Sequence, residues 1–174
     1  MDSETIFQTC IKAILQHEGG LTQDPNDPGG ITNWGVSLRF LLDAEPALHP
    51  SDATIKSMTE RQAIEIYRQF WWNKFHYANF TQLIVVEKVF DMAVNMGNSE
   101  AVKLLQSVIN KLIVTPIAVD GILGNLSFSY ANSLDGTAIR QGLRNSAAQR
   151  YEDIVQANPA MERYLKGWLN RAQW

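Results

Sequence analysis

Glu18 combines an acidic side chain with a position that disfavours its charged form. Apolar residues recur at helical spacing over residues 4–18, and Glu18 follows Ile14 by four residues and Leu15 by three, so it continues the apolar face. It also lies in the last helical turn, before Gly19, where the helix dipole disfavours a negative charge. Partial burial would favour its protonated form, which suits a general acid. The alternative is a helix-end glutamate that turns to solvent or pairs with a core arginine.

Asp27 and Thr32 follow in a segment rich in glycine and proline. Two carboxyl groups can act together, one as general acid and the other as nucleophile or as the base that activates water, and Asp27 could be the second group. Its alternative is turn formation, because aspartate before Pro-Gly is ordinary turn chemistry. Thr32 could position an attacking water through its hydroxyl, or be an ordinary β-branched loop residue.

The elements that must position these residues are nearly all helices. Apolar periodicity and capping signals predict helices over residues 4–18, 37–44, 59–73, 82–96, 99–112, 126–134 and 135–155, and a last one from residue 158. Thr59 opens a capping box, and Thr81 and Ser99 are the predicted caps of the next two helices. The helix over 82–96 is apolar on most sides, which is typical of a central helix. We expect a mostly α, multi-helix single globular unit of seven to nine helices, with one small hairpin near the site.

Composition limits the classes of protein that this chain can be. Its 174 residues are 45% apolar and 19% charged, which is typical of a globular chain rather than a disordered one. The net charge of −3 argues against general nucleic-acid binding, and the sequence lacks the 18-residue apolar run of a membrane span. The histidines lack ligand spacing, and the single cysteine, Cys10, lies on the apolar stripe of the first helix. We therefore expect no internal disulfide, no metal and no cofactor.

The segment from Glu18 to Val36 resembles a known motif. Three runs are similar to the opening motif of glycoside hydrolase family 108: Glu18-Gly19-Gly20, Asp27-Pro28-Gly29-Gly30 and Thr32-Asn33-Trp34-Gly35-Val36. The members of this family are lysozyme-like N-acetylmuramidases, also called secretion activator proteins. The resemblance implies that Glu18 is the catalytic acid. The spacing also resembles that of phage-type lysozymes, which implies Asp27 and Thr32 as catalytic partners, although the four residues between them are one fewer than in that pattern.

The second half of the chain carries another resemblance. Residues 90–97 and the run Val119-Asp120-Gly121-Ile122-Leu123-Gly124 are similar to the predicted peptidoglycan domain that follows the muramidase motif in this family, with Ser127 in place of a threonine. We therefore expect a muramidase catalytic region over residues 1–82 and a helical peptidoglycan-binding-like region over residues 83–174 packed against it.

Aromatic side chains could line a sugar groove, because flat rings stack on pyranose faces. Trp71 continues the apolar face of its predicted helix, so Trp34 and Trp72 are the better candidates for exposed rings. The full set of predicted substrate-binding residues is Asn33, Trp34, Tyr67, Trp72, Asp91 and Asn95.

The polar members of this set have structural alternatives. Asn33 could hydrogen-bond an N-acetyl group or brace its own loop. Asp91 and Asn95 lie four residues apart on one face of the apolar helix, where buried polar groups need partners. They could brace the catalytic loop or touch substrate.

These features together predict a peptidoglycan hydrolase, an N-acetylmuramidase that cleaves the β-1,4 bond between N-acetylmuramic acid and N-acetylglucosamine with Glu18 as general acid. The alternatives are a lytic transglycosylase that uses the same glutamate, and a non-catalytic peptidoglycan-binding or secretion-accessory module. The expected partner is the peptidoglycan glycan strand. The acidic N-terminus is unlike a secretory signal peptide, so we expect synthesis in the cytoplasm, release through a holin-like pore as for a phage endolysin, and action on the cell wall in the periplasm.

Overall fold

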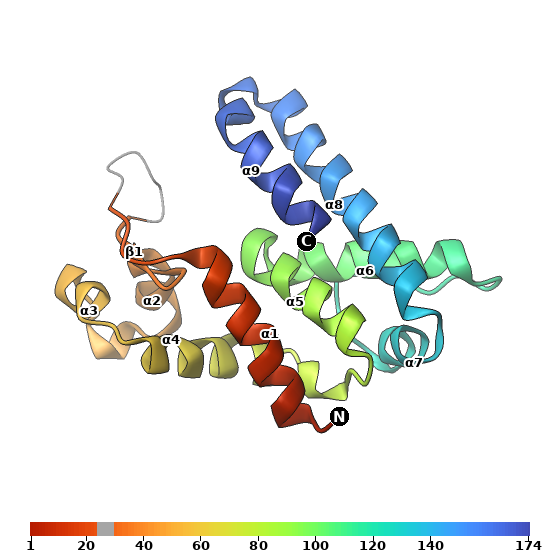
Figure 1. Cartoon of the computed structure of the whole chain (residues 1–174), viewed down its shortest axis with the longest axis horizontal. Helices are drawn as coiled ribbons and strands as arrows, with labels where there is room; N and C mark the ends of the chain where they lie inside the picture. The colour runs from red at the N-terminus through yellow and green to blue at the C-terminus, as the bar shows by residue number, and fades with distance from the viewer. Residues whose placement is uncertain (24–29) are drawn as a thin grey trace. The chain divides into compact units, whose positions relative to one another are not determined.

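The computed structural model describes residues 1–23 and 30–174, without the side chains of His17, Glu18 and Pro46 (Figure 1). The chain divides into two compact units. The first unit is Glu4–Phe75, and the second unit is Met1–Ser3 together with His76–Trp174. Each has its own core of buried apolar side chains. The boundary expected between residues 82 and 83 stays a prediction.

Helix α1 (Ser3–Glu18) carries the apolar stripe that the sequence predicts. All six members of the stripe are buried: Ile6, Phe7, Cys10, Ile11, Ile14 and Leu15. Burial of Cys10 confirms its predicted role in core packing. Gly19 follows with φ of +70°, a left-handed conformation that glycine adopts readily at the end of a helix. Gly19 therefore ends α1 at Glu18.

A small hairpin follows the segment after α1. Strands β1 (Thr32–Asn33) and β2 (Val36–Ser37) pair antiparallel across a two-residue turn. The turn residues Trp34 and Gly35 have φ of +53° and +76°, as a type I′ turn requires. The predicted hairpin is confirmed.

Short helices complete the first unit. They are α2 (Leu38–Ala44), the 3₁₀ turn η1 (Pro46–Leu48), α3 (Asp52–Lys56), α4 (Glu60–Tyr67) and the π-helical η2 (Arg68–Asn73). The capping box at Thr59 is confirmed: its backbone N–H donates to Gln62 Oε1 over 2.8 Å, and its side chain accepts from the Gln62 backbone N–H over 3.3 Å. This box fixes the start of α4.

The sequence reasoning missed α3. No helix is predicted between residues 44 and 59, where Pro46 and Pro50 disfavour one. The helix begins beyond them, after Ser51, whose backbone N–H donates to Thr54 Oγ1 over 3.0 Å. A single turn of helix is too short to show apolar periodicity in the sequence.

The second unit is a helical bundle. It contains η3 (Tyr77–Asn79), α5 (Leu83–Met96), α6 (Asn98–Leu112), α7 (Asn125–Ser133), α8 (Gly136–Ala157), η4 (Pro159–Met161) and α9 (Glu162–Gln173). Helix α5 packs against both α6 and α8, as its largely apolar surface leads one to expect. The pair α8 and α9 run side by side, as the blue helices of Figure 1 show.

Two predicted caps are wrong. The N-cap of α5 is Gln82 rather than Thr81, and the Gln82 side chain reaches out to α7, donating to the carbonyls of Ala131 and Leu134 over 3.0 and 2.8 Å. Helix α6 begins at Asn98, directly after Gly97, and not behind a Ser99 cap. Tertiary contacts and one glycine set these two helix starts, in place of the local caps.

The mostly α fold with one small hairpin is confirmed. Across residues 1–23 and 30–174 the structure has nine α-helices and one two-stranded sheet. Within the same ranges, no helix combines the length and the apolar character needed to cross a bilayer.

Candidate active site

The predicted acid stands at the last position of α1. Glu18 ends the helix, and the side-chain positions of His17 and Glu18 lie outside the described part of the chain. Asp27 falls within residues 24–29, which also lie outside the described residues. The roles of Glu18 and Asp27 therefore stay predictions.

Thr32 is held by its backbone on both sides. It pairs with Ser37 in the hairpin, and its N–H and carbonyl exchange hydrogen bonds of 3.0 and 2.8 Å with Thr22. Its hydroxyl donates to the Gly30 carbonyl over 3.5 Å, which is long for a hydroxyl donor. The backbone of Thr32 is thus fixed while its hydroxyl is only weakly engaged, which is an arrangement suited to contact with a ligand or water.

Asn33 braces the hairpin from within. The side chain is buried, and its Nδ2 donates to the carbonyls of Ile55 over 3.0 Å and Met58 over 3.4 Å. These bonds tie β1 to the end of α3. Of the two roles left open for Asn33, the brace is the one that these contacts support.

Trp34 has a strained backbone conformation and is held by two hydrogen bonds. A non-glycine residue at φ of +53° costs free energy, of order 1–3 kcal/mol. Its indole N–H donates to the Met58 carbonyl over 3.2 Å, and its own carbonyl accepts from the Tyr67 hydroxyl over 3.2 Å. A strained residue held from both ends is a reason to look for function in its ring.

The expectation that Trp72 is an exposed ring is wrong. Trp72 is 2% exposed and packs edge-on against Phe7, with ring centroids 5.2 Å apart, while Trp71 is half-buried. The reason is η2: a π-helical turn places the residue five positions after Tyr67, rather than four, on the buried face. Tyr67 itself is 0% exposed. Both rings belong to the core and offer no face to a sugar.

Asp91 and Asn95 connect helices of the second unit. Asp91 is 1% exposed; its Oδ1 accepts from Arg171 Nε of α9 over 2.9 Å, and its Oδ2 lies 3.5 Å from Lys88 Nζ. Asn95 Oδ1 accepts from the Tyr151 hydroxyl of α8 over 2.6 Å. Burial makes Asp91 inaccessible to a substrate, so its role is structural.

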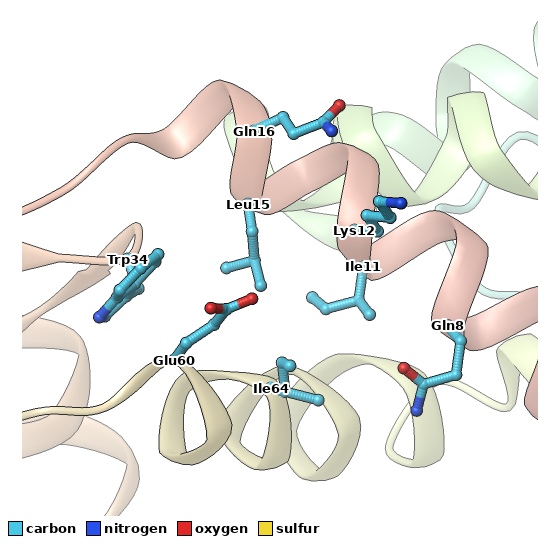
Figure 2. Close-up of a pocket in the computed structure, with 8 residues that line it drawn as sticks. All are labelled: Gln8, Ile11, Lys12, Leu15, Gln16, Trp34, Glu60 and Ile64. Carbon is cyan, nitrogen blue, oxygen red and sulfur yellow. The ribbon is translucent and has the colours of Figure 1, made fainter.

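A groove of about 500 Å³ runs between α1 and α4. Figure 2 shows apolar side chains of α1 pointing toward α4, a carboxylate of α4 pointing back, and the Trp34 ring at one end. The lining residues are Gln8, Ile11, Lys12, Leu15, Gln16, Trp34, Glu60 and Ile64. All belong to the first unit. The groove runs along the helix that ends at Glu18.

The sequence reasoning missed every polar residue of this groove. A signal was available: Gln8, Lys12 and Gln16 recur every four residues, so they form one polar row beside the apolar stripe of α1. Glu60 carries no such signal, because an acidic residue in the first turn of a helix is ordinary. Only the packing of α4 against α1 places it here.

The site offers acid–base chemistry and hydrogen bonding. Among the described residues, no three histidine, cysteine, aspartate or glutamate side chains gather in a way that could hold a metal ion. The described polar groups of the groove are one carboxylate, one ammonium, two amides and the Trp34 indole N–H that donates to Met58.

Comparison with known proteins locates both halves of the chain. Residues 11–97 match the family model described as Glycosyl hydrolase 108, and residues 100–173 match the model described as Predicted Peptidoglycan domain. Among solved structures, the chain is similar to the structure of Brucella abortus SagA at 26% sequence identity and a TM-score of 0.79, covering 98% of this chain and 91% of that chain. No curated protein matches the sequence. The resemblances to glycoside hydrolase family 108 and to the predicted peptidoglycan domain are confirmed, as is the fold class inferred from the sequence.

Proposed function

We propose that this chain, which belongs to the glycosyl hydrolase 108 family, is an N-acetylmuramidase with Glu18 as its general acid. The family and the peptidoglycan model that follows it support a peptidoglycan hydrolase of lysozyme-like activity. The proposal adds the bond, which is the β-1,4 linkage between N-acetylmuramic acid and N-acetylglucosamine. It also adds the residue that protonates the leaving oxygen.

One observation carries the assignment of Glu18. It is the terminal residue of a helix whose apolar stripe is buried, and that same helix forms one wall of the groove. The buried stripe anchors the helix that carries Glu18, and general acid catalysis requires an acid on an anchored element. Trp34 at the groove end supplies a flat ring for a pyranose.

The second catalytic group is Asp27 or Thr32. A carboxylate would act as nucleophile or as the base that activates water. The weakly engaged hydroxyl of Thr32 supports the other choice, in which Thr32 orients the water. A single variant at each residue separates the two choices, because only loss of the true second group should lower the rate of hydrolysis strongly.

The decisive experiment follows new reducing ends released from purified murein. We expect Glu18→Gln to lower the rate at least about 100-fold, because general acid catalysis contributes that much, while its thermal melt stays as in the wild type. Glu152→Gln, an exposed substitution on α8, serves as the matched control and should keep the wild-type rate. Full activity of Glu18→Gln would remove Glu18 from the mechanism.

Product analysis separates the remaining alternatives. A hydrolase leaves reducing ends, whereas a lytic transglycosylase leaves 1,6-anhydro ends that mass spectrometry identifies. Soluble fragments with anhydro ends would replace the muramidase assignment by a transglycosylase using the same acid. Binding to murein without any soluble fragment would indicate a non-catalytic module.

The place of action is part of the same proposal. One matched model describes a glycosyl hydrolase and the other a peptidoglycan domain. The glycan strand of the cell wall is therefore the proposed partner. Release through a holin-like pore remains the proposed route to it.

A further inference from the structure

The groove between α1 and α4 has an aliphatic floor, whereas a cleft that stacks sugars is lined by aromatic rings. The floor consists of three aliphatic side chains, Ile11, Leu15 and Ile64. Trp34 is the only aromatic ring among the lining residues and stands at one end (Figure 2). An aliphatic floor suits methyl and methylene groups better than the polar face of a pyranose.

The groove also carries one charge of each sign. Lys12 lies on the α1 margin, and the Glu60 carboxylate points from α4 toward Leu15 (Figure 2). Both side chains are exposed, and among the described side chains neither has an ion-pair partner. The dipole of α4 favours the negative charge of Glu60 at its first turn. An anion and a cation that remain unpaired across one groove present complementary charge to a ligand that carries both.

We propose that this groove binds the stem peptide of peptidoglycan. This proposal rests on the proposed function and extends it to the part of the substrate that the groove recognises. The neutral N-acetylglucosamine units of the glycan strand carry no charge, and the strand has no cation to offer Glu60. A stem peptide has carboxylates, small aliphatic side chains and, where its third residue is an unsubstituted diamino acid, a free ammonium. Lys12 pairs with a peptide carboxylate, Glu60 with the ammonium, and the alanyl methyl groups lie on the aliphatic floor.

The length of the groove fits this ligand. From Gln8 to Gln16 the α1 wall rises about 12 Å at about 1.5 Å per residue. An extended peptide advances about 3.3 Å per residue, so the wall matches three to four residues. The Gln8 and Gln16 amides can hydrogen-bond the peptide backbone along this wall. The glycan then lies toward the Glu18 end of α1, and the enzyme prefers glycan that still bears its peptides.

The test has a binding arm and an activity arm. In the first, calorimetry measures the affinity of the whole protein for a synthetic stem tetrapeptide whose N-terminus is acetylated and whose third-position side-chain amine is free. Exposed ion pairs are weak, so we expect Lys12→Gln and Glu60→Gln each to weaken binding about three- to fivefold. Acetylation of the peptide amine should weaken binding to the wild type, and should have no effect on Glu60→Gln.

The matched controls are Lys56→Gln and Asp43→Asn, two exposed first-unit positions outside the groove. They should bind the tetrapeptide as the wild type does. Thermal melts check that all four variants are folded. No binding by the wild type, or equal binding by wild type and both groove variants, overturns the proposal.

The activity arm compares kcat/KM on glycan strands with and without stem peptides, the latter prepared with an amidase. We expect the wild type to prefer peptide-bearing strands by about tenfold, and each groove variant to reduce this ratio. Equal rates on both substrates overturn the groove assignment and leave the muramidase assignment standing. Absence of reducing ends from both substrates, with tetrapeptide binding intact, overturns the muramidase assignment alone. Loss of all activity in Glu60→Gln with unchanged peptide binding would make Glu60 part of the chemistry and overturn its peptide role.

Discussion

Two sets of charged side chains, one in each unit, have opposite settings. In the second unit, Lys88 and Asp91 are each 1% exposed, and Arg171 joins them through Asp91. In the first unit, Lys12 and Glu60 are exposed and have no ion-pair partner among the described side chains. Charges that are buried and paired connect helices, whereas exposed and unpaired charges beside a groove remain available to a ligand. Burial and pairing, rather than residue type, separate the two roles.

The largest effect should come from breaking the buried cluster. Asp91→Ala leaves the Lys88 ammonium buried without its carboxylate, so we expect the free energy of unfolding to fall by about 3–5 kcal/mol. Urea denaturation measures the loss. The exposed substitution Asp43→Ala should change stability by less than about 0.5 kcal/mol. A loss below about 1 kcal/mol for Asp91→Ala would mean that the buried cluster does not hold α5 and α9 together.

The buried Lys88 should also make the stability of the protein depend on pH. Burial lowers the pKa of Lys88 from 10.5 to about 8, against the opposing effect of Asp91, and the nearby Arg140 and Arg171 lower it further. Between these two pH values the unfolded chain binds the proton more tightly than the folded one. The contribution of Lys88 to stability therefore rises with pH, by up to about 3 kcal/mol.

Lys88→Met tests this prediction, since it removes the titrating group and keeps an unbranched apolar stem. Between pH 7.5 and 9.5, the melting temperature of the wild type should change more favourably than that of the variant. Parallel trends for the two proteins would show that Lys88 does not titrate in this range.

The smallest effect on stability belongs to Trp34. Asparagine tolerates positive φ, so Trp34→Asn relieves backbone strain while losing the bond to Met58, and we expect the free energy of unfolding to change by no more than about 1 kcal/mol. Release of reducing ends should nevertheless fall about tenfold, because the ring at the groove end is lost. Trp34→Phe, which keeps a ring, should retain more activity. A stability loss of several kcal/mol in Trp34→Asn would assign the ring to the core.

Local patterns in the sequence were sufficient for much of the fold. The apolar spacing of α1 and the glycine after Glu18 place the helix end, and the Thr59 box places the start of α4. These signals work because a helical turn involves residues only three or four positions apart. The same locality explains the failures at Thr81 and Ser99, where a distant contact or a glycine defined the helix start.

What the sequence by itself determined is the set of α-helices apart from α3, the hairpin, and the position of Glu18 at a helix end. Only the tertiary structure decided that Trp72 lies inside while Trp71 is half-exposed, that Arg171 neutralises a carboxylate 80 residues earlier, and that Glu60 faces the wall of α1. Each of these depends on a π-helical turn or on packing between elements far apart in the chain. Periodicity records which side of a helix is apolar, whereas the identity of the neighbour across the interface is a property of the folded chain.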